Sequence, residues 1–82
     1  LMKMKGFVPL LLTHEIVLKL CRNGIEGDYF ITEGNIGNYQ IVRFSRERNA
    51  ADIYSLKVDE NSLAIPDKYK KKFKLNRAVE LP

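Results

Sequence analysis

Residues 57–82 read KVDENSLAIPDKYKKKFKLNRAVELP, and this stretch decides the fold that the sequence predicts. A short apolar strand at residues 63–65 leads directly into Pro66, whose fixed φ and missing N–H suit the first turn of a helix. Tyr69 and Phe73 lie four residues apart and form one apolar stripe of a short, Lys-rich helix. A second short strand is expected at residues 79–81. The order predicts a small β-α-β unit.

The preceding residues predict one further helix and several strands. Thr13 is a suitable N-cap, Ile16 and Leu20 supply an inward apolar face, and Gly24 suits a helix end, so we expect a helix over residues 13–22. We also expect a buried strand within residues 3–12 and strands at 29–31, 39–44 and 53–58, with a turn at 34–38 that joins the strands at 29–31 and 39–44.

The chain divides into two comparable halves. Ile16 and Leu20 follow Thr13 by three and seven residues, and Tyr69 and Phe73 follow Pro66 by the same intervals. Each predicted helix is followed by a short apolar strand. We therefore interpret residues 1–82 as a single domain with an approximate internal repeat, in which halves 3–44 and 53–82 are joined by a basic loop at 45–52.

Residues 57–82 resemble the DNA-binding domains of the AbrB, MazE and SpoVT transition-state regulators and antitoxins. The resemblance rests on KVDE at 57–60, LAIP at 63–66, Tyr69, Phe73 and a terminal VEL at 79–81. In that family two chains interleave as a swapped-hairpin β-barrel, and basic residues near the hairpins contact DNA. Asn61-Ser62 stands where the family has Gly-Arg, and Asn76-Arg77 stands where it has Gly-Asp.

The predicted fold is therefore α+β, a small β-rich barrel with two short helices. If each chain supplies one half-barrel, the protein is a swapped-hairpin homodimer. If both halves lie in one chain, the barrel is double-psi-like. A chain of 82 residues buries only about 60% of its unfolded surface, so pairing with a second copy would add to a marginal core.

Basic residues gather in two regions of a chain with 14 Lys and Arg against 10 Asp and Glu, a net charge of +4. Arginine in a hairpin loop can hold a guanine base with its planar fork, and a lysine cluster gains affinity for phosphates by releasing counterions. The alternative for both regions is an ordinary solvated surface. The residues that we expect to contact DNA are Arg43, Arg46, Arg48, Lys57, Lys68, Lys71, Lys72 and Arg77.

A second hypothesis is a protein-interaction module that binds no nucleic acid, such as an immunity protein, an antitoxin or a viral inhibitor of a host protein. An acidic partner would be attracted by the same basic surface. Residues 13–31, with GIEGDYFI at 24–31, resemble the helix and first core strand of phosphotyrosine-binding Src-homology domains. In that family an arginine binds the phosphate. Here Thr32 stands near the position of that arginine, and threonine cannot form bidentate, charged hydrogen bonds to a phosphate.

The sequence predicts no enzyme, cofactor or metal site. His14 and Cys21 share one side of the predicted helix, but a nucleophilic pair also needs an orienting third group and a pocket. A lone cysteine and a lone histidine lack the spacing of a zinc site. The apolar run at 7–12 is too short for a membrane span of about 20 residues. We therefore expect a cytoplasmic protein, or a viral one in the host cytosol, with no membrane partner.

Overall fold

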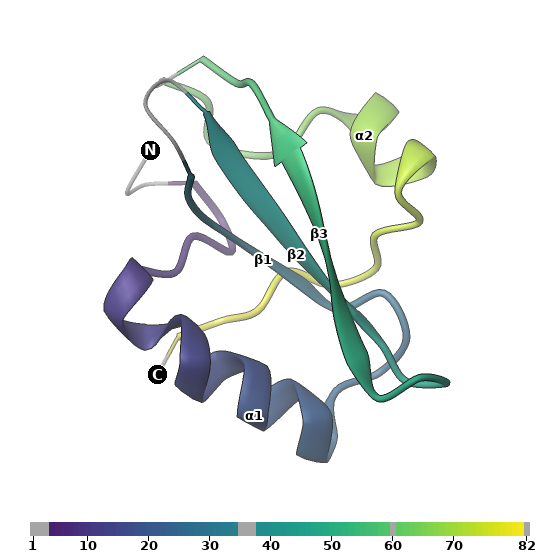
Figure 1. Cartoon of the computed structure of the whole chain (residues 1–82). Helices are drawn as coiled ribbons and strands as arrows, with labels where there is room; N and C mark the ends of the chain where they lie inside the picture. Colours follow the sequence, from purple (N-terminus) through teal and green to yellow (C-terminus); the bar gives the residue numbers. More distant parts are fainter. Residues whose placement is uncertain (1–3, 35–37, 60, 82) are drawn as a thin grey trace.

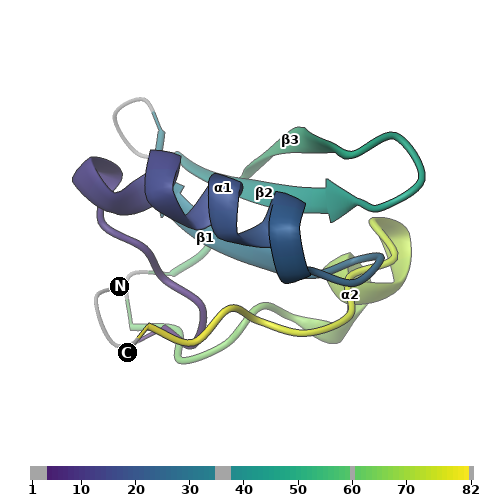
Figure 2. The same cartoon turned by 90° about the horizontal axis from the view of Figure 1, so that it is seen from below.

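A three-stranded antiparallel sheet lies at the centre of the chain, in a computed structural model that describes residues 4–34, 38–59 and 61–81 (Figure 1). The sheet order is β1-β2-β3, which also is the chain order. One helix packs on each face, as the view from below shows (Figure 2). The elements are η1 (Leu10–Leu12), α1 (Thr13–Asn23), β1 (Tyr29–Glu33), β2 (Tyr39–Ser45), β3 (Ala50–Leu56) and α2 (Asp67–Lys72).

The two helices cover opposite faces because side chains alternate along the strands. Phe30 and Phe44 point toward α1 and are packed with Ile16 and Leu20 of that helix. Their neighbours in the strands point to the other face, where the apolar residues of α2 cover them. That second cluster contains Tyr29, Ile31, Ile41, Leu56 and Ile65, with Tyr69 and Phe73 packed against it. The core therefore has two layers with the sheet between them.

The two edges of the sheet differ. Beside β1, residues 6–8 and 77–79 run parallel to the strand and bond to its backbone: the Val8 N–H donates to the Ile31 carbonyl at 2.8 Å, and the Val79 N–H donates to the Tyr29 carbonyl at 2.8 Å. These segments cover the β1 edge. β3 pairs with β2 alone among the described strands, so its outer edge faces away from the rest of the sheet.

The α+β class, the two helices and the three central strands are confirmed. The first helix covers Thr13–Asn23, as the apolar spacing predicted, but Leu12 is its N-cap, and the Thr13 hydroxyl donates back to the Leu10 carbonyl at 2.9 Å. The turn η1 precedes the helix and moves its start by one residue. The predicted stripe of Tyr69 and Phe73 does face the core.

Other predictions about the fold are not confirmed. Residues 63–65 form no strand: Ile65 is buried in the core, whereas Leu63 is 66% exposed, and the edge of β1 is already occupied. At the C-terminus a single bridge from Ala78 to Tyr29 replaces the predicted strand, and one bridge from Phe7 together with η1 replaces a strand within 3–12. The described sheet is open, so the structure does not confirm the barrel, the internal repeat or the swapped hairpin.

Residues 1–3, 35–37, 60 and 82 lie outside the described part of the chain. They include most of the predicted turn at 34–38 and the last residue of the KVDE motif. The strands on either side of that turn do pair as predicted, with Glu33 opposite Tyr39.

Candidate functional site

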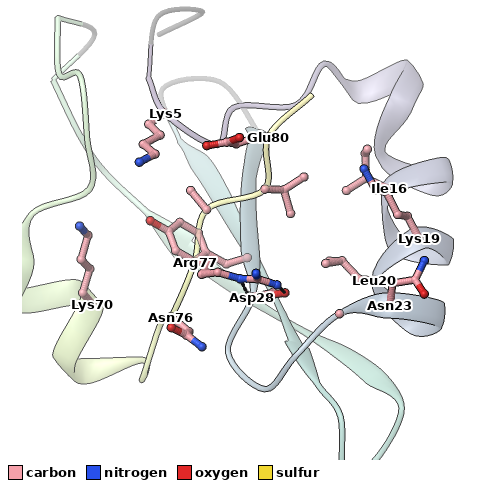
Figure 3. A pocket seen from close by; sticks show the side chains of 14 residues that line it. Lys5, Ile16, Lys19, Leu20, Asn23, Asp28, Lys70, Asn76, Arg77 and Glu80 are labelled. Carbon is pink, nitrogen blue, oxygen red and sulfur yellow. Dashed lines mark hydrogen bonds and ion pairs between the residues drawn. The ribbon is translucent and has the colours of Figure 1, made fainter. Parts of the chain in front are cut away.

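A cavity of about 670 Å³ opens between α1, the N-terminal segment and the C-terminal segment (Figure 3). We call it the basic groove. Figure 3 shows Lys19, Leu20 and Asn23 of α1 at one side, Lys5 and Lys70 at the other, and Arg77 with Asp28 between them. Its apolar lining consists of Ile16, Leu20, Tyr29, Ala78 and Val79, and its cationic lining consists of Lys5, Lys19, Lys70 and Arg77.

Helical geometry explains the α1 side of the basic groove. Ile16 and Leu20 are one turn apart and enter the core, with exposed fractions of 7% and 6%. Lys19 and Asn23 are also one turn apart and border that apolar stripe, so they line the groove while remaining exposed. This side of the groove therefore combines an apolar surface with a cationic rim.

The C-terminal side is held by an ion pair between Arg77 and Asp28. The Arg77 Nε and Nη2 atoms donate to the two carboxylate oxygens of Asp28 at 3.1 and 2.9 Å, and the Ile25 N–H adds a third bond at 3.0 Å. Burial of Asp28 opposes its ionisation, but these donors outweigh it, and the pKa of the carboxyl lies below its ordinary value. Asp28 is therefore an anion neutralised from within the protein.

A second ion pair, between Arg43 and Glu26, helps to anchor the C-terminal segment where it begins, at residues 74–76. Arg43 donates from Nη2 to Glu26 at 3.1 Å and from Nε to the Lys74 carbonyl at 3.2 Å. The Asn76 side-chain amide donates to the Glu26 carbonyl at 3.2 Å. Residues 74–79 are thus fixed along β1 by side chains as well as by backbone bonds, and this fixes the wall of the basic groove.

The charges around the basic groove leave an excess of cations. Asp28 is engaged by Arg77, so Glu80 is the remaining acidic side chain in the lining. Within the described part of the chain, no carboxylate pairs with Lys5, Lys19 or Lys70. A low-dielectric floor beneath such a rim strengthens the attraction of an anionic group that enters. The arrangement suits a ligand that carries both carboxylates and apolar side chains.

The arginines predicted to contact DNA have partners inside the protein. Arg43 is only 9% exposed. The Arg46 Nη1 donates to the Cys21 carbonyl at 3.0 Å, and its backbone N–H donates to Glu26 at 2.6 Å, so the pKa of Glu26 lies below its ordinary value. Arg48 is paired with Asp52, which raises the pKa of the Arg48 guanidinium. Arg48 therefore braces the β2–β3 hairpin itself, whereas Arg43 and Arg46 tie the hairpin to residues 21–26 and Lys74.

The remaining predicted residues divide between the basic groove and the open surface. Arg77 lines the groove. Lys57, Lys68, Lys71 and Lys72 are exposed and do not line it. Two of them lie over aromatic rings, Lys68 at 5.0 Å from the Tyr69 centroid and Lys72 at 5.5 Å from the Phe73 centroid.

Three groove lysines are not among the residues that we expected individually to contact DNA. The position of Lys19 could have been predicted, because it borders the apolar stripe of a helix that was predicted correctly. Lys70 belonged to a cluster whose members could not be told apart without the position of α2. Lys5 carried no signal, since only the tertiary fold brings the N-terminal segment to the groove.

Thr32 lies where the Src-homology resemblance expects the phosphate-binding arginine. It is 3% exposed, and its hydroxyl has no hydrogen-bond partner in the described structure. A buried threonine cannot supply the bidentate cation that grips a phosphate. This position therefore departs from the phosphate-binding pattern of that family.

Comparison with protein-family models found no match, and no curated protein matches the chain significantly. Among the described residues, no group of three or more His, Cys, Asp or Glu side chains is arranged to hold a metal ion. The described helices are also all too short or too polar to cross a bilayer.

Proposed function

We propose that the protein is a protein-interaction module that binds an acidic, partly apolar segment of a partner protein in the basic groove. One observation carries the proposal: the groove joins an apolar floor to three lysines that have no carboxylate partner in the described part of the chain. Charge complementarity of this kind steers a partner toward a site and selects it over neutral competitors. The anchored wall at 74–79 gives the ligand a surface that is formed before binding.

DNA binding is the other function that the sequence predicts, and the bonds of the arginines argue against it. Base readout needs guanidinium forks that can turn toward a groove of the duplex. Arg43 is buried, and Arg48 and Arg77 are paired with Asp52 and Asp28. The exposed lysines of α2 are still free to contact phosphates, so DNA binding is also measured in the test below.

The Src-homology resemblance supports an interaction module, because a helix leading into the first core strand is what it implies, and α1 leads into β1. Thr32 argues against a phosphotyrosine ligand. We therefore place the ligand in the basic groove, which is lined by Lys19, Lys70 and Arg77 rather than by Thr32.

The test is a selection of random peptides displayed on phage against the immobilised protein. We expect the selected pool to be enriched in Asp and Glu interspersed with apolar residues. The selected peptides are then titrated by fluorescence anisotropy against Lys19→Glu and Lys70→Glu. Loss of one groove cation and gain of an anion should weaken binding about tenfold or more.

Matched controls come from the same helices. Arg22→Glu on α1 and Lys71→Glu on α2 make the same charge change at exposed positions outside the groove lining. They should weaken binding less than about threefold, an effect of net charge alone. A pool without acidic enrichment, or equal losses in groove and control variants, would overturn the proposal. Tight binding of a 20-base-pair DNA duplex that all four variants weaken alike would favour the nucleic-acid function.

A further inference from the structure

The outer edge of β3 is unpaired among the described strands and lies apart from the basic groove. β3 is one of the two longest strands of the sheet, with seven residues, and it pairs with β2 alone among the described strands. No backbone hydrogen bond joins residues 50–56 to any described residue outside the sheet. Backbone groups along this edge are therefore open to pairing with another strand.

The strand lacks the features that keep sheet edges apart. Its sequence, AADIYSL, contains no proline, lysine or arginine, and Asp52, its one charged residue, is engaged by Arg48. Ile53 lies at the centre of the strand and is 62% exposed. Natural edge strands are commonly protected by a charge, a proline or a bulge. A regular, largely uncharged strand with an exposed central isoleucine is suited to strand pairing.

We infer that two copies of the chain pair through β3, antiparallel and around a two-fold axis at Ile53. This register is self-complementary: Ile53 meets Ile53 of the second copy, Asp52 lies opposite Tyr54, and Ala51 lies opposite Ser55. No two like charges face each other in it. A register centred on Asp52 would bring two carboxylates together, and like charges directly opposite are destabilising.

Pairing through β3 joins the two sheets into one of six strands and leaves both basic grooves outside the interface. The groove lies beside β1, at the far edge of each sheet from β3. A dimer would therefore present two grooves at its outer sides. A partner with two acidic segments would then bind with an avidity that exceeds either single affinity. The dimer itself does not depend on what the grooves bind.

The experiment is sedimentation equilibrium of the full chain, with Ile53→Lys as the disrupting variant and Leu63→Lys as its control. Leu63 is 66% exposed, lies outside the strands and undergoes the same change in charge. We expect a dimer for the unchanged chain and for Leu63→Lys, and at least a tenfold larger dissociation constant for Ile53→Lys. A monomer of the unchanged chain at millimolar concentration, or equal behaviour of the two variants, would overturn the inference.

A cysteine cross-link tests the register. In a Cys21→Ser background, Ile53→Cys should be joined into a covalent dimer by a short thiol-to-thiol cross-linker, because directly opposed Cβ atoms lie about 4.5–5.5 Å apart, slightly beyond the roughly 3.5–4.5 Å of a direct disulfide. Leu63→Cys in the same background should not. Equal cross-linking of the two variants would indicate random collision and contradict the two-fold axis at Ile53.

Discussion

At the scale of single residues, hydrogen bonds to Asp28 hold the C-terminal segment in position. Asp28 is 4% exposed, and its carboxylate accepts hydrogen bonds from Arg77 and from the Ile25 N–H. The segment that Arg77 belongs to has little secondary structure of its own, with only the Ala78 bridge. Loss of this bond set would release one wall of the basic groove, so Asp28 links local stability to the proposed site.

We predict that Asp28→Asn lowers the free energy of unfolding at neutral pH by about 1–3 kcal/mol, since it removes charged hydrogen bonds to a buried group. The native pKa of Asp28 lies below the ordinary value of about 3.9, so the unfolded chain binds more protons on acidification. The contribution is thus complete at neutral pH and is lost from about pH 5 downward.

Urea unfolding between about pH 7 and about pH 3 measures this prediction. Asp28→Asn should lose less stability on acidification than the unchanged chain does. Some acid sensitivity should remain, because the pKa of Glu26 is also lowered. Parallel pH profiles of the two proteins would show that the Asp28 ion pair adds nothing to the native state.

Gly27 is the position where the backbone requires glycine most clearly. Its φ is +87°, and an added Cβ would lie 2.9 Å from the Lys74 carbonyl oxygen and 3.0 Å from the Asn76 Cβ. Gly27→Ala should therefore lower the free energy of unfolding by about 1–3 kcal/mol. Gly34 is the control: its nearest neighbour is the flexible Gln40 side chain, so Gly34→Ala should change stability by less than about 1 kcal/mol in thermal unfolding.

At the scale of elements, α2 depends on aromatic packing. It has only six residues, too few for a stable isolated helix, and Phe73 at its end stacks on Tyr54 of β3 with ring centroids 4.2 Å apart. Tyr69 lies 6.1 Å from Phe73 and extends the stack. Tertiary contact, rather than lysine content, therefore positions this helix and brings Lys70 to the basic groove.

We predict that Phe73→Ala lowers the free energy of unfolding by about 2 kcal/mol, less than the 3–5 kcal/mol typical of a fully buried phenylalanine, because Phe73 is half-buried. Phe73→Leu, which keeps most of the apolar volume, should lose about half as much. Chemical denaturation of both variants gives the comparison. Equal stability of Phe73→Ala and the unchanged chain would contradict the packing role.

The elements show which parts of the fold were predictable. The periodic spacing of Ile16 and Leu20 located α1, and β-rich runs located the three strands, because these patterns are local. The strands predicted at 63–65 and 79–81 failed for a tertiary reason. Residues 6–8 and 77–79 divide the outer edge of β1 between them, so each forms one isolated bridge, and residues 63–65 pair with neither β1 nor the outer edge of β3.

At the scale of the whole molecule, sequence distance explains why the site was only partly predictable. Two of the predicted arginines pair with residues that are distant in the sequence. Arg43 pairs with Glu26, and Arg77 pairs with Asp28, 49 residues away. From the sequence alone these arginines look available to a ligand. Folding instead pairs them with carboxylates and leaves Lys5, Lys19 and Lys70 around an apolar floor.

The whole sheet also separates the two proposed surfaces. One edge, beside β1, carries the basic groove, and the opposite edge, β3, is open. Binding of an acidic segment at the first edge and pairing of two chains at the second can therefore occur together. The two proposals fail independently, because Ile53→Lys leaves the groove lining unchanged and Lys19→Glu leaves β3 unchanged.

The most direct test of peptide binding in the basic groove is an amide chemical-shift titration of the ¹⁵N-labelled full chain with a selected acidic peptide. We expect the largest shifts on Lys19, Asn23, Lys70, Ala78 and Val79, which line the basic groove. Shifts concentrated instead on the hairpin loop at 46–49 and on Lys57 would contradict binding in the basic groove and would favour the basic surface predicted to contact DNA.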